Sequence, residues 1–293
     1  MKETKKSYGF AVLTIFLWST LATVSKLLLN SLDVMLVLAV SSTIGAVALL
    51  LYNQLRGNLK DLWQCSWKEL ISMCLLGFLG FFLYNWFYLL GIARLPSQQA
   101  MVINYLWPAL IIVFSSIIYK QKMTGKKILA VLFSLVGVTI VAMNGNPRAL
   151  VGGNLQGVLC CLAAAVCYAL YASINKGQTY PKELSMFIVF AVTAVSSIAG
   201  ASFSGSLSEI SKLTIGMWAG LFFSGVFINA IGYTSWMLAL EYGKTAVISN
   251  LAYLIPFLSM VIARIVLKEE ISMYSIIGLF LIISGIGIQI REQ

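Results

Sequence analysis

The chain has 293 residues, of which 60% are hydrophobic and only 10% are charged. Soluble domains carry about 25% charged residues, so the composition excludes an ordinary soluble domain and indicates an integral membrane protein. The net charge of +10 is spread over the short connections between apolar segments. There it sets membrane topology and contacts lipid, so we expect no nucleic-acid partner.

Ten segments without Asp, Glu, Lys or Arg follow one another along the chain. They are 7–25, 34–55, 70–93, 95–119, 128–147, 149–175, 184–208, 213–240, 245–263 and 271–290. A membrane-spanning helix needs about 20 mostly apolar residues, and in lipid the backbone must satisfy its own hydrogen bonds. The sequence therefore predicts an all-α integral membrane protein with ten transmembrane helices. The first segment has too long an apolar run for a cleaved signal peptide.

The basic residues predict the orientation of these helices. With ten spans both termini lie on one side of the membrane, and fourteen of the 20 Lys and Arg residues fall on that side. Four fall on the other side, namely Arg94, Arg148, Lys212 and Lys268. Cytoplasmic loops are the ones rich in Lys and Arg. We therefore expect a multi-pass protein of the cell membrane, in a bacterial inner membrane or a plasma membrane, with both termini in the cytoplasm.

The second half of the sequence repeats the first. A slide of 148 residues lays 105–140 on 253–288, with ten identities among 36 positions, including Pro108/Pro256, Lys120/Lys268 and Gly137/Gly285. We predict two repeats, residues 1–148 and 149–293. Each has five spans, an odd number, so the second repeat enters the membrane inverted. Inverted repeats are common in secondary transporters, which bind substrate near the bilayer midplane between them.

Two prolines lie at matched depth, Pro108 and Pro256, each near the centre of its span. Proline lacks an N–H group and clashes with the carbonyl four residues back, so the carbonyls of Asn104 and Ala252 lose their helical partners. Freed backbone at this depth is tolerated beside other protein or a wet cavity. We expect either a cavity at these breaks or two kinks that serve packing alone.

Polar and aromatic side chains form stripes at spacings of three, four and seven residues, which places each set on one helix face. Together with the two prolines they are the predicted substrate-binding residues: Trp18, Tyr84, Asn85, Tyr88, Asn104, Tyr105, Tyr168, Tyr171, Asn229, Tyr233, Trp236 and Tyr253. Tyr and Trp also gather at the membrane interface, which is an equal alternative for Tyr88 and Trp236. For the others the alternative is packing between helices.

Charged and metal-binding groups are scarce within the spans. The chain has no histidine, and its five cysteines match no metal or disulfide spacing, so we expect no catalytic residues, no metal and no cofactor, and the chain is not predicted to be an enzyme. Ion-driven transporters hold a carboxylate or several oxygen ligands at depth. Neither is expected here, which favours transport down the substrate gradient, while a proton path through Glu241 stays open. Lys26 either extends to the interface or acts at depth, as an electrostatic gate or as a contact to a substrate carboxylate.

Aromatic and amide walls suit a small organic solute with an apolar part and hydrogen-bonding groups. We predict a secondary transporter for amino acids, including aromatic or apolar ones, that works by alternating access through a midplane cavity. The alternatives are a carrier of quaternary ammonium or other organic cations, and a passive channel. The pairs Gly153/Gly157 and Gly216/Gly220 allow close helix packing within a monomer or in a homodimer.

Several short motifs resemble those of a known family. They are FLWSTLATVSK (16–26), NYLWPALIIVF (104–114), LFSLVGVTIV (132–141), YLIPFL (253–258), LKEE (267–270) and LIISGIGI (281–288). The chain resembles the drug/metabolite transporter superfamily in its EamA-type branch, and LWST and NYLWP are similar to bacterial aromatic amino acid exporters. The resemblance implies an inner-membrane carrier with a central cavity formed by helices 1, 3, 4, 6, 8 and 9, and adds nucleoside-like metabolites as alternative cargo. For amino acids we expect the direction to be export. Of the family's glutamates after helices 4 and 9, the second repeat keeps Glu269 and Glu270, whereas the first has Lys120, Gln121 and Lys122.

Overall fold

The computed structural model describes residues 2–146, 153–243, 248 and 251–290, and these residues contain helices and no strand. The helices are α1 (Lys2–Leu29), α2 (Val34–Arg56), η1 (Asn58–Gln64), α3 (Trp67–Gly77), η2 (Phe78–Leu83), α4 (Tyr84–Arg94), α5 (Ser97–Asn104), α6 (Trp107–Ile118), α7 (Gly125–Met143), α8 (Gly153–Asn175), α9 (Lys182–Ser204), η4 (Ser206–Lys212), α10 (Ile215–Phe222), η5 (Phe223–Gly232), α11 (Tyr233–Tyr242), α13 (Leu254–Val266) and α14 (Met273–Ile290). The predicted boundary between residues 148 and 149 lies outside the described residues, as do Arg148, Lys244 and Arg291.

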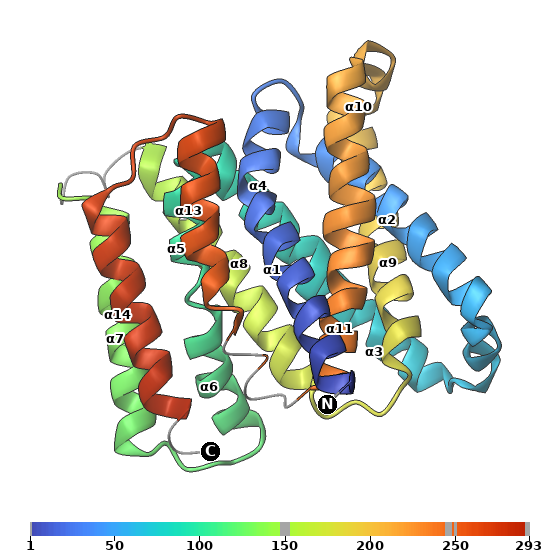
Figure 1. Cartoon of the computed structure of the whole chain (residues 1–293). Coiled ribbons are helices and arrows are strands. Elements are labelled where there is room, and N and C mark those ends of the chain that lie inside the picture. Colours follow the sequence, from blue (N-terminus) through green and yellow to red (C-terminus); the bar gives the residue numbers. More distant parts are fainter. Residues whose placement is uncertain (1, 147–152, 244–247, 249–250, 291–293) are drawn as a thin grey trace.

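Eight helical stretches are long and apolar enough to cross a membrane, and they correspond to the first eight predicted spans. The ninth and tenth predicted spans correspond to the shorter apolar helices Leu254–Val266 and Met273–Gly285. Three of the eight stretches join consecutive elements: α3, η2 and α4; α5 and α6; and α10, η5 and α11. The start of α1 and the end of α14 lie at the same end of the helix bundle (Figure 1).

The two prolines follow real breaks in their spans. In the fourth span α5 ends at Asn104 and α6 begins at Trp107, with Pro108 in its first turn. A proline in this turn removes no helical hydrogen bond, because the first N–H groups of a helix have no helical partner. The corresponding turn precedes α13, which carries Pro256 near its start. The Ala252 carbonyl in that turn accepts the Tyr105 hydroxyl at 2.8 Å, so the two breaks bind each other directly.

Helices of the two halves pack in matched pairs. α7 lies along α14, and α2 lies along α9 (Figure 1). In addition, α4 packs on α8 as α11 packs on α1, and α6 packs on α8 as α13 packs on α1. The π-helical segments η2 and η5 directly precede α4 and α11. Lys120 and Lys268, which the 148-residue slide aligns, both have left-handed backbones, with φ of 51° and 57°.

Candidate functional site

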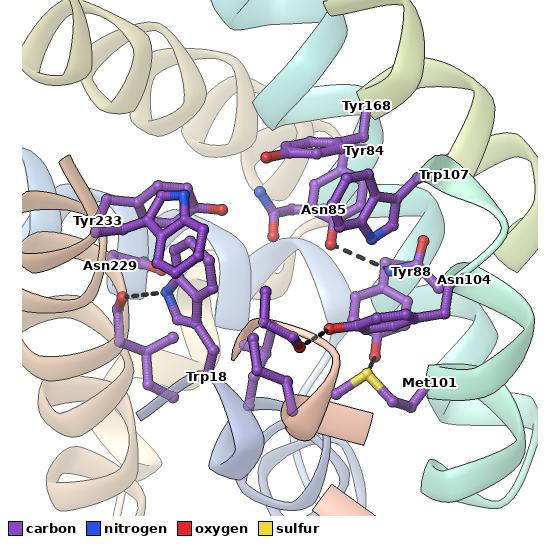
Figure 2. Close-up of a pocket in the computed structure, with 16 residues that line it drawn as sticks. Trp18, Tyr84, Asn85, Tyr88, Met101, Asn104, Trp107, Tyr168, Asn229 and Tyr233 are labelled. Atoms are coloured by element: carbon purple, nitrogen blue, oxygen red, sulfur yellow. Dashed lines mark hydrogen bonds between the residues drawn. The ribbon is translucent and has the colours of Figure 1, made fainter. Parts of the chain in front are cut away.

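A cavity of about 100 Å³ lies where α1, α4, α5, α8, η5 and α11 converge (Figure 2). We call it the aromatic pocket. Its lining residues are Trp18, Leu21, Tyr84, Asn85, Tyr88, Met101, Asn104, Tyr105, Trp107, Tyr168, Ile228, Asn229, Tyr233, Trp236, Ala252 and Ile255. One water needs about 10–15 Å³ on this measure, so the pocket holds several waters or part of a small solute.

The structure brings ten of the fourteen predicted site residues to this pocket and leaves four out of its lining: Pro108, Tyr171, Tyr253 and Pro256. Both prolines are buried in the helices that follow the breaks, so it is the residues at the breaks that reach the cavity. Tyr171 lies one turn beyond Tyr168 and packs edge-on against Phe81 at 5.2 Å, in a core shared with α2 and α9. Tyr253 is half-buried in the turn before α13.

Aromatic rings form two walls of the pocket. In one wall Trp18 packs against Tyr233 and Trp236, with ring centroids 4.8 and 5.6 Å apart. In the other wall Tyr168 packs against Tyr84 and Trp107, both at 5.2 Å. Figure 2 shows Trp18 and Tyr233 on the opposite side of the cavity from Tyr84 and Trp107. A planar apolar group between these walls can therefore contact rings on both sides.

Hydrogen bonds hold both walls in position. Trp18 Nε1 donates to the Ile228 carbonyl at 3.3 Å, in the π-helical segment η5. Asn104 Nδ2 donates to the Tyr84 hydroxyl at 3.2 Å, while Asn104 Oδ1 is buried with no partner among the described residues. None of the described lining residues is charged. The pocket therefore suits a solute with an apolar ring or chain and a few hydrogen-bonding groups.

Six lining residues are not among the predicted site residues: Leu21, Met101, Trp107, Ile228, Ala252 and Ile255. A signal existed for three of them at helical spacing, since Leu21 lies three residues after Trp18, and Met101 and Trp107 lie three residues before and after Asn104. Met101 shares the Asn104 stripe and lies close enough for its sulfur to accept the Tyr88 hydroxyl at 3.5 Å. The side chains of the remaining three, Ile228, Ala252 and Ile255, are aliphatic, so the spacing of polar residues does not indicate them.

Two charged side chains bind the connection between α4 and α5. Lys26 Nζ donates to the carbonyls of Ile92 and Leu95 at 2.7 and 2.8 Å, at the C-terminus of α4. The Glu269 carboxylate accepts the Ser97 N–H and Ser97 hydroxyl, both at 2.9 Å, at the N-terminus of α5. Each charge has the sign that its helix end favours. Lys26 therefore binds backbone rather than extending free to the interface.

Replacing Glu269 by alanine is expected to destabilise the protein by about 2 kcal/mol, because hydrogen bonds to a charged group contribute roughly 1.5–3 kcal/mol. Thermal unfolding of the purified protein in detergent measures the loss. Glu270→Ala is the matched control, since it removes the same side chain from the next position. Glu270 is exposed, and its carboxylate makes no hydrogen bond within the described residues. Equal losses in both variants would show that Glu269 does not cap α5.

A second, smaller cavity adjoins the aromatic pocket and shares Leu21, Asn85 and Asn229 with it. We call it the polar chamber. Its wall also contains five hydroxyl groups, from Ser25, Ser41, Ser42, Thr193 and Ser224. This finding corrects the expectation that no group of oxygen ligands lies at depth. The hydroxyls come from four separate spans, so only the packing of α1, α2, α9 and η5 brings them together.

Glu241 does not line either cavity. It is exposed near the end of α11, and neither the aromatic pocket nor the polar chamber includes it. The glycines of the two GxxxG pairs whose surroundings are described pack within the chain or lie open. Gly157 faces Leu95, and Gly220 faces Leu28 of α1. These contacts support close packing inside one monomer.

Known proteins resemble this chain over most of its length. The sequence pattern of the EamA-like transporter family matches it over residues 5–143 and again over 155–290. Uncharacterized transporter YyaM of Bacillus subtilis is 28% identical over 227 residues, which are 75% of this chain and 72% of the relative. Aromatic amino acid exporter YddG of Ancylobacter novellus is 24% identical over 247 residues, 84% of this chain and 83% of the relative. A solved crystal structure with 21% identity superposes with a TM-score of 0.64 and covers 97% of this chain and 96% of that one, which shows the same fold.

Proposed function

This chain belongs to the EamA-like transporter family, and from that premise we propose that it exports amino acids with aromatic or apolar side chains. It is a multi-pass membrane protein, and its family and named relatives are transporters rather than enzymes. The observation that carries the proposal is the aromatic pocket, an uncharged cavity between two ring walls. Three of its rings, those of Trp18, Tyr84 and Tyr105, come from near the middle of their predicted spans, where a headgroup cannot reach.

The proposed mechanism is alternating access between two inverted five-helix repeats, residues 1–148 and 149–293, with both termini in the cytoplasm. The matched packing of α2 with α9 and of α7 with α14 supports this division. So do the equivalent left-handed backbones at Lys120 and Lys268. The pocket draws residues from both halves, so a rocking movement of one half against the other would expose it to each side in turn.

Export of amino acids is favoured over the alternatives by two observations. One similar protein is named an aromatic amino acid exporter, and the ring walls match an aromatic side chain. A quaternary ammonium ion has no N–H group to donate, so it would depend on a carboxylate near the cation, and none of the described lining residues is acidic. Nucleoside-like metabolites would also stack between the rings, so they belong in the test. A passive channel would conduct ions without saturable exchange.

Counterflow in proteoliposomes tests the proposal. Vesicles loaded with unlabelled phenylalanine should accumulate labelled phenylalanine, tryptophan or leucine transiently and saturably, whereas vesicles without protein should not. Choline and adenosine serve as competing solutes, and stronger competition by either one than by phenylalanine would favour that class of cargo. A saturable signal for no amino acid, or single-channel currents alone, would contradict the proposal.

We also propose that transport runs down the substrate gradient, because the aromatic pocket has no charged group among its described residues. A protonophore should then leave counterflow unchanged. An imposed pH gradient that drives uptake against the amino acid gradient would instead show proton coupling, and the exposed Glu241 would be the first residue to replace.

A further inference from the structure

The polar chamber is small and lies directly beside the aromatic pocket. Its volume is about 30 Å³, room for about two waters. Asn85 and Asn229 lie in the walls of both cavities, and Figure 2 shows Asn85 beside Tyr84 and Asn229 beside Trp18 and Tyr233. A solute held between the rings could therefore place one small group in the chamber without leaving the pocket.

Three of the five hydroxyl groups in the chamber wall already use their donor hydrogens. Ser41 and Thr193 donate their hydroxyl hydrogens to the carbonyls of Val37 and Val189, four residues back in their own helices, at 2.6 and 2.8 Å. Ser42 donates in the same way to the Leu38 carbonyl. Each hydroxyl has one hydrogen and two lone pairs. The oxygens of these three hydroxyls are then left to accept hydrogen bonds.

Asn85 extends this pattern, whereas Ser25, Ser224 and Asn229 donate no side-chain hydrogen bond within the described residues. The Asn85 amide nitrogen donates to the Phe81 carbonyl at 2.8 Å, which leaves its side-chain oxygen as an acceptor. The Ser224 hydroxyl is buried, in a side chain only 7% exposed, and has no partner among the described residues. Buried polar groups in folded proteins are almost always paired. An unpaired hydroxyl in the wall of a cavity therefore points to a ligand or water that binds there.

We propose that the polar chamber binds the protonated primary amino group of the substrate. Such a group carries three N–H donors and no acceptor, which complements the free acceptor oxygens of four wall residues, Ser41, Ser42, Thr193 and Asn85. A primary ammonium group also fits the volume of the chamber, which holds about two waters. A trimethylammonium group is too large for that volume and has no N–H group. The inference rests on the proposed function and makes it specific: the cargo must have a free ammonium group beside its apolar part.

Competition in the counterflow assay tests the ligand chemistry. Uptake of labelled phenylalanine is measured in the presence of one of four unlabelled competitors: phenylalanine, phenethylamine, 3-phenylpropionate or N,N,N-trimethylphenylalanine. The first two keep the primary ammonium group, the third lacks it, and the fourth carries it fully methylated. We expect the last two to compete about tenfold more weakly than phenylalanine, the factor that the loss of one hydrogen bond to a charged group produces.

A matched pair of variants tests the location. Thr193→Val removes one acceptor oxygen from the chamber with little change in shape. Thr139→Val is the control, because Thr139 on α7 makes the same kind of bond, to the Leu135 carbonyl at 2.8 Å, but is exposed and lines neither cavity. We expect Thr193→Val to raise the KM for phenylalanine about tenfold and to reduce the difference between phenylalanine and 3-phenylpropionate. Thr139→Val should change neither.

The outcomes separate this inference from the proposed function. If amino acids are exchanged but 3-phenylpropionate competes as well as phenylalanine, the inference fails and the proposed function stands. The inference also fails if Thr193→Val behaves like Thr139→Val. If transport requires Na⁺ and Thr193→Val raises only that requirement, the chamber binds an alkali ion rather than the substrate. Absence of counterflow for every amino acid would overturn both.

Discussion

Replacing Trp18 by alanine is expected to lower phenylalanine counterflow at least about tenfold in protein that still inserts into the membrane. The Trp18 ring packs against Tyr233 and Trp236, and its Nε1 donates to the Ile228 carbonyl. An aromatic pair contributes about 0.5–1.5 kcal/mol beyond burial, and a tenfold change needs about 1.4 kcal/mol. Loss of both ring contacts therefore removes one wall of the pocket and the surface on which the substrate would stack.

Two further variants separate substrate binding from folding. Trp18→Phe keeps a ring in the wall and loses the N–H group, so we expect it to retain most of the transport. Trp63→Ala removes an equal side chain that is 93% exposed, so we expect wild-type transport. Rates are compared per amount of folded protein, measured by size-exclusion chromatography. If Trp18→Ala transports normally on that basis, Trp18 does not contribute to the transport site.

Replacing Gly278 by alanine is expected to lower the free energy of unfolding by about 1–3 kcal/mol, the usual cost of overpacking. α7 and α14 pack closely at this point. A Cβ atom on Gly278 would lie 2.6 Å from the Gly137 carbonyl oxygen and would also collide with the Val141 side chain. Because one of these neighbours is helix backbone, the two helices must separate. Thermal unfolding in detergent measures the change.

Gly287→Ala is the matched control, since it makes the same substitution on the same helix. A Cβ atom on Gly287 would meet nothing within 4 Å. Alanine is the better helix former by roughly 0.5–1 kcal/mol, so this variant should be neutral or slightly stabilising. If Gly287→Ala destabilises the protein as much as Gly278→Ala, the loss comes from alanine in α14 itself. Close packing of α14 against α7 at Gly278 would then not explain it.

Much of the pocket could be predicted from residue type and spacing. A tyrosine, tryptophan or asparagine near the middle of an apolar span must face other helices or a cavity, because lipid cannot form hydrogen bonds with its polar group. Ten predicted residues of these three types do line the aromatic pocket. Tyr171 shows the limit of this reasoning, because it has the same spacing as its neighbours. It packs against Phe81 in the core between α8 and η2 instead.

The prolines show the same limit at the level of the backbone. Pro108 and Pro256 correctly mark breaks in two spans, but the side chains that reach the pocket belong to the residues at the breaks, such as Tyr105 and Ala252. A proline in the first turn of a helix costs no helical hydrogen bond, so its ring packs as part of the helix that follows the break. Spacing along one helix could not show that the Tyr105 hydroxyl would bind the Ala252 carbonyl.

The amino-acid sequence alone was enough to identify a helical membrane protein with two similar halves and uncharged aromatic stripes. These properties are local, because they follow from the polarity of each residue and from its place in a helix. The polar chamber depends on the packing of four spans, since Ser25, Ser42, Thr193 and Ser224 are far apart in sequence. Serine and threonine within apolar helices are common and usually bond to their own backbone, so nothing in the order of residues distinguished these four from the others.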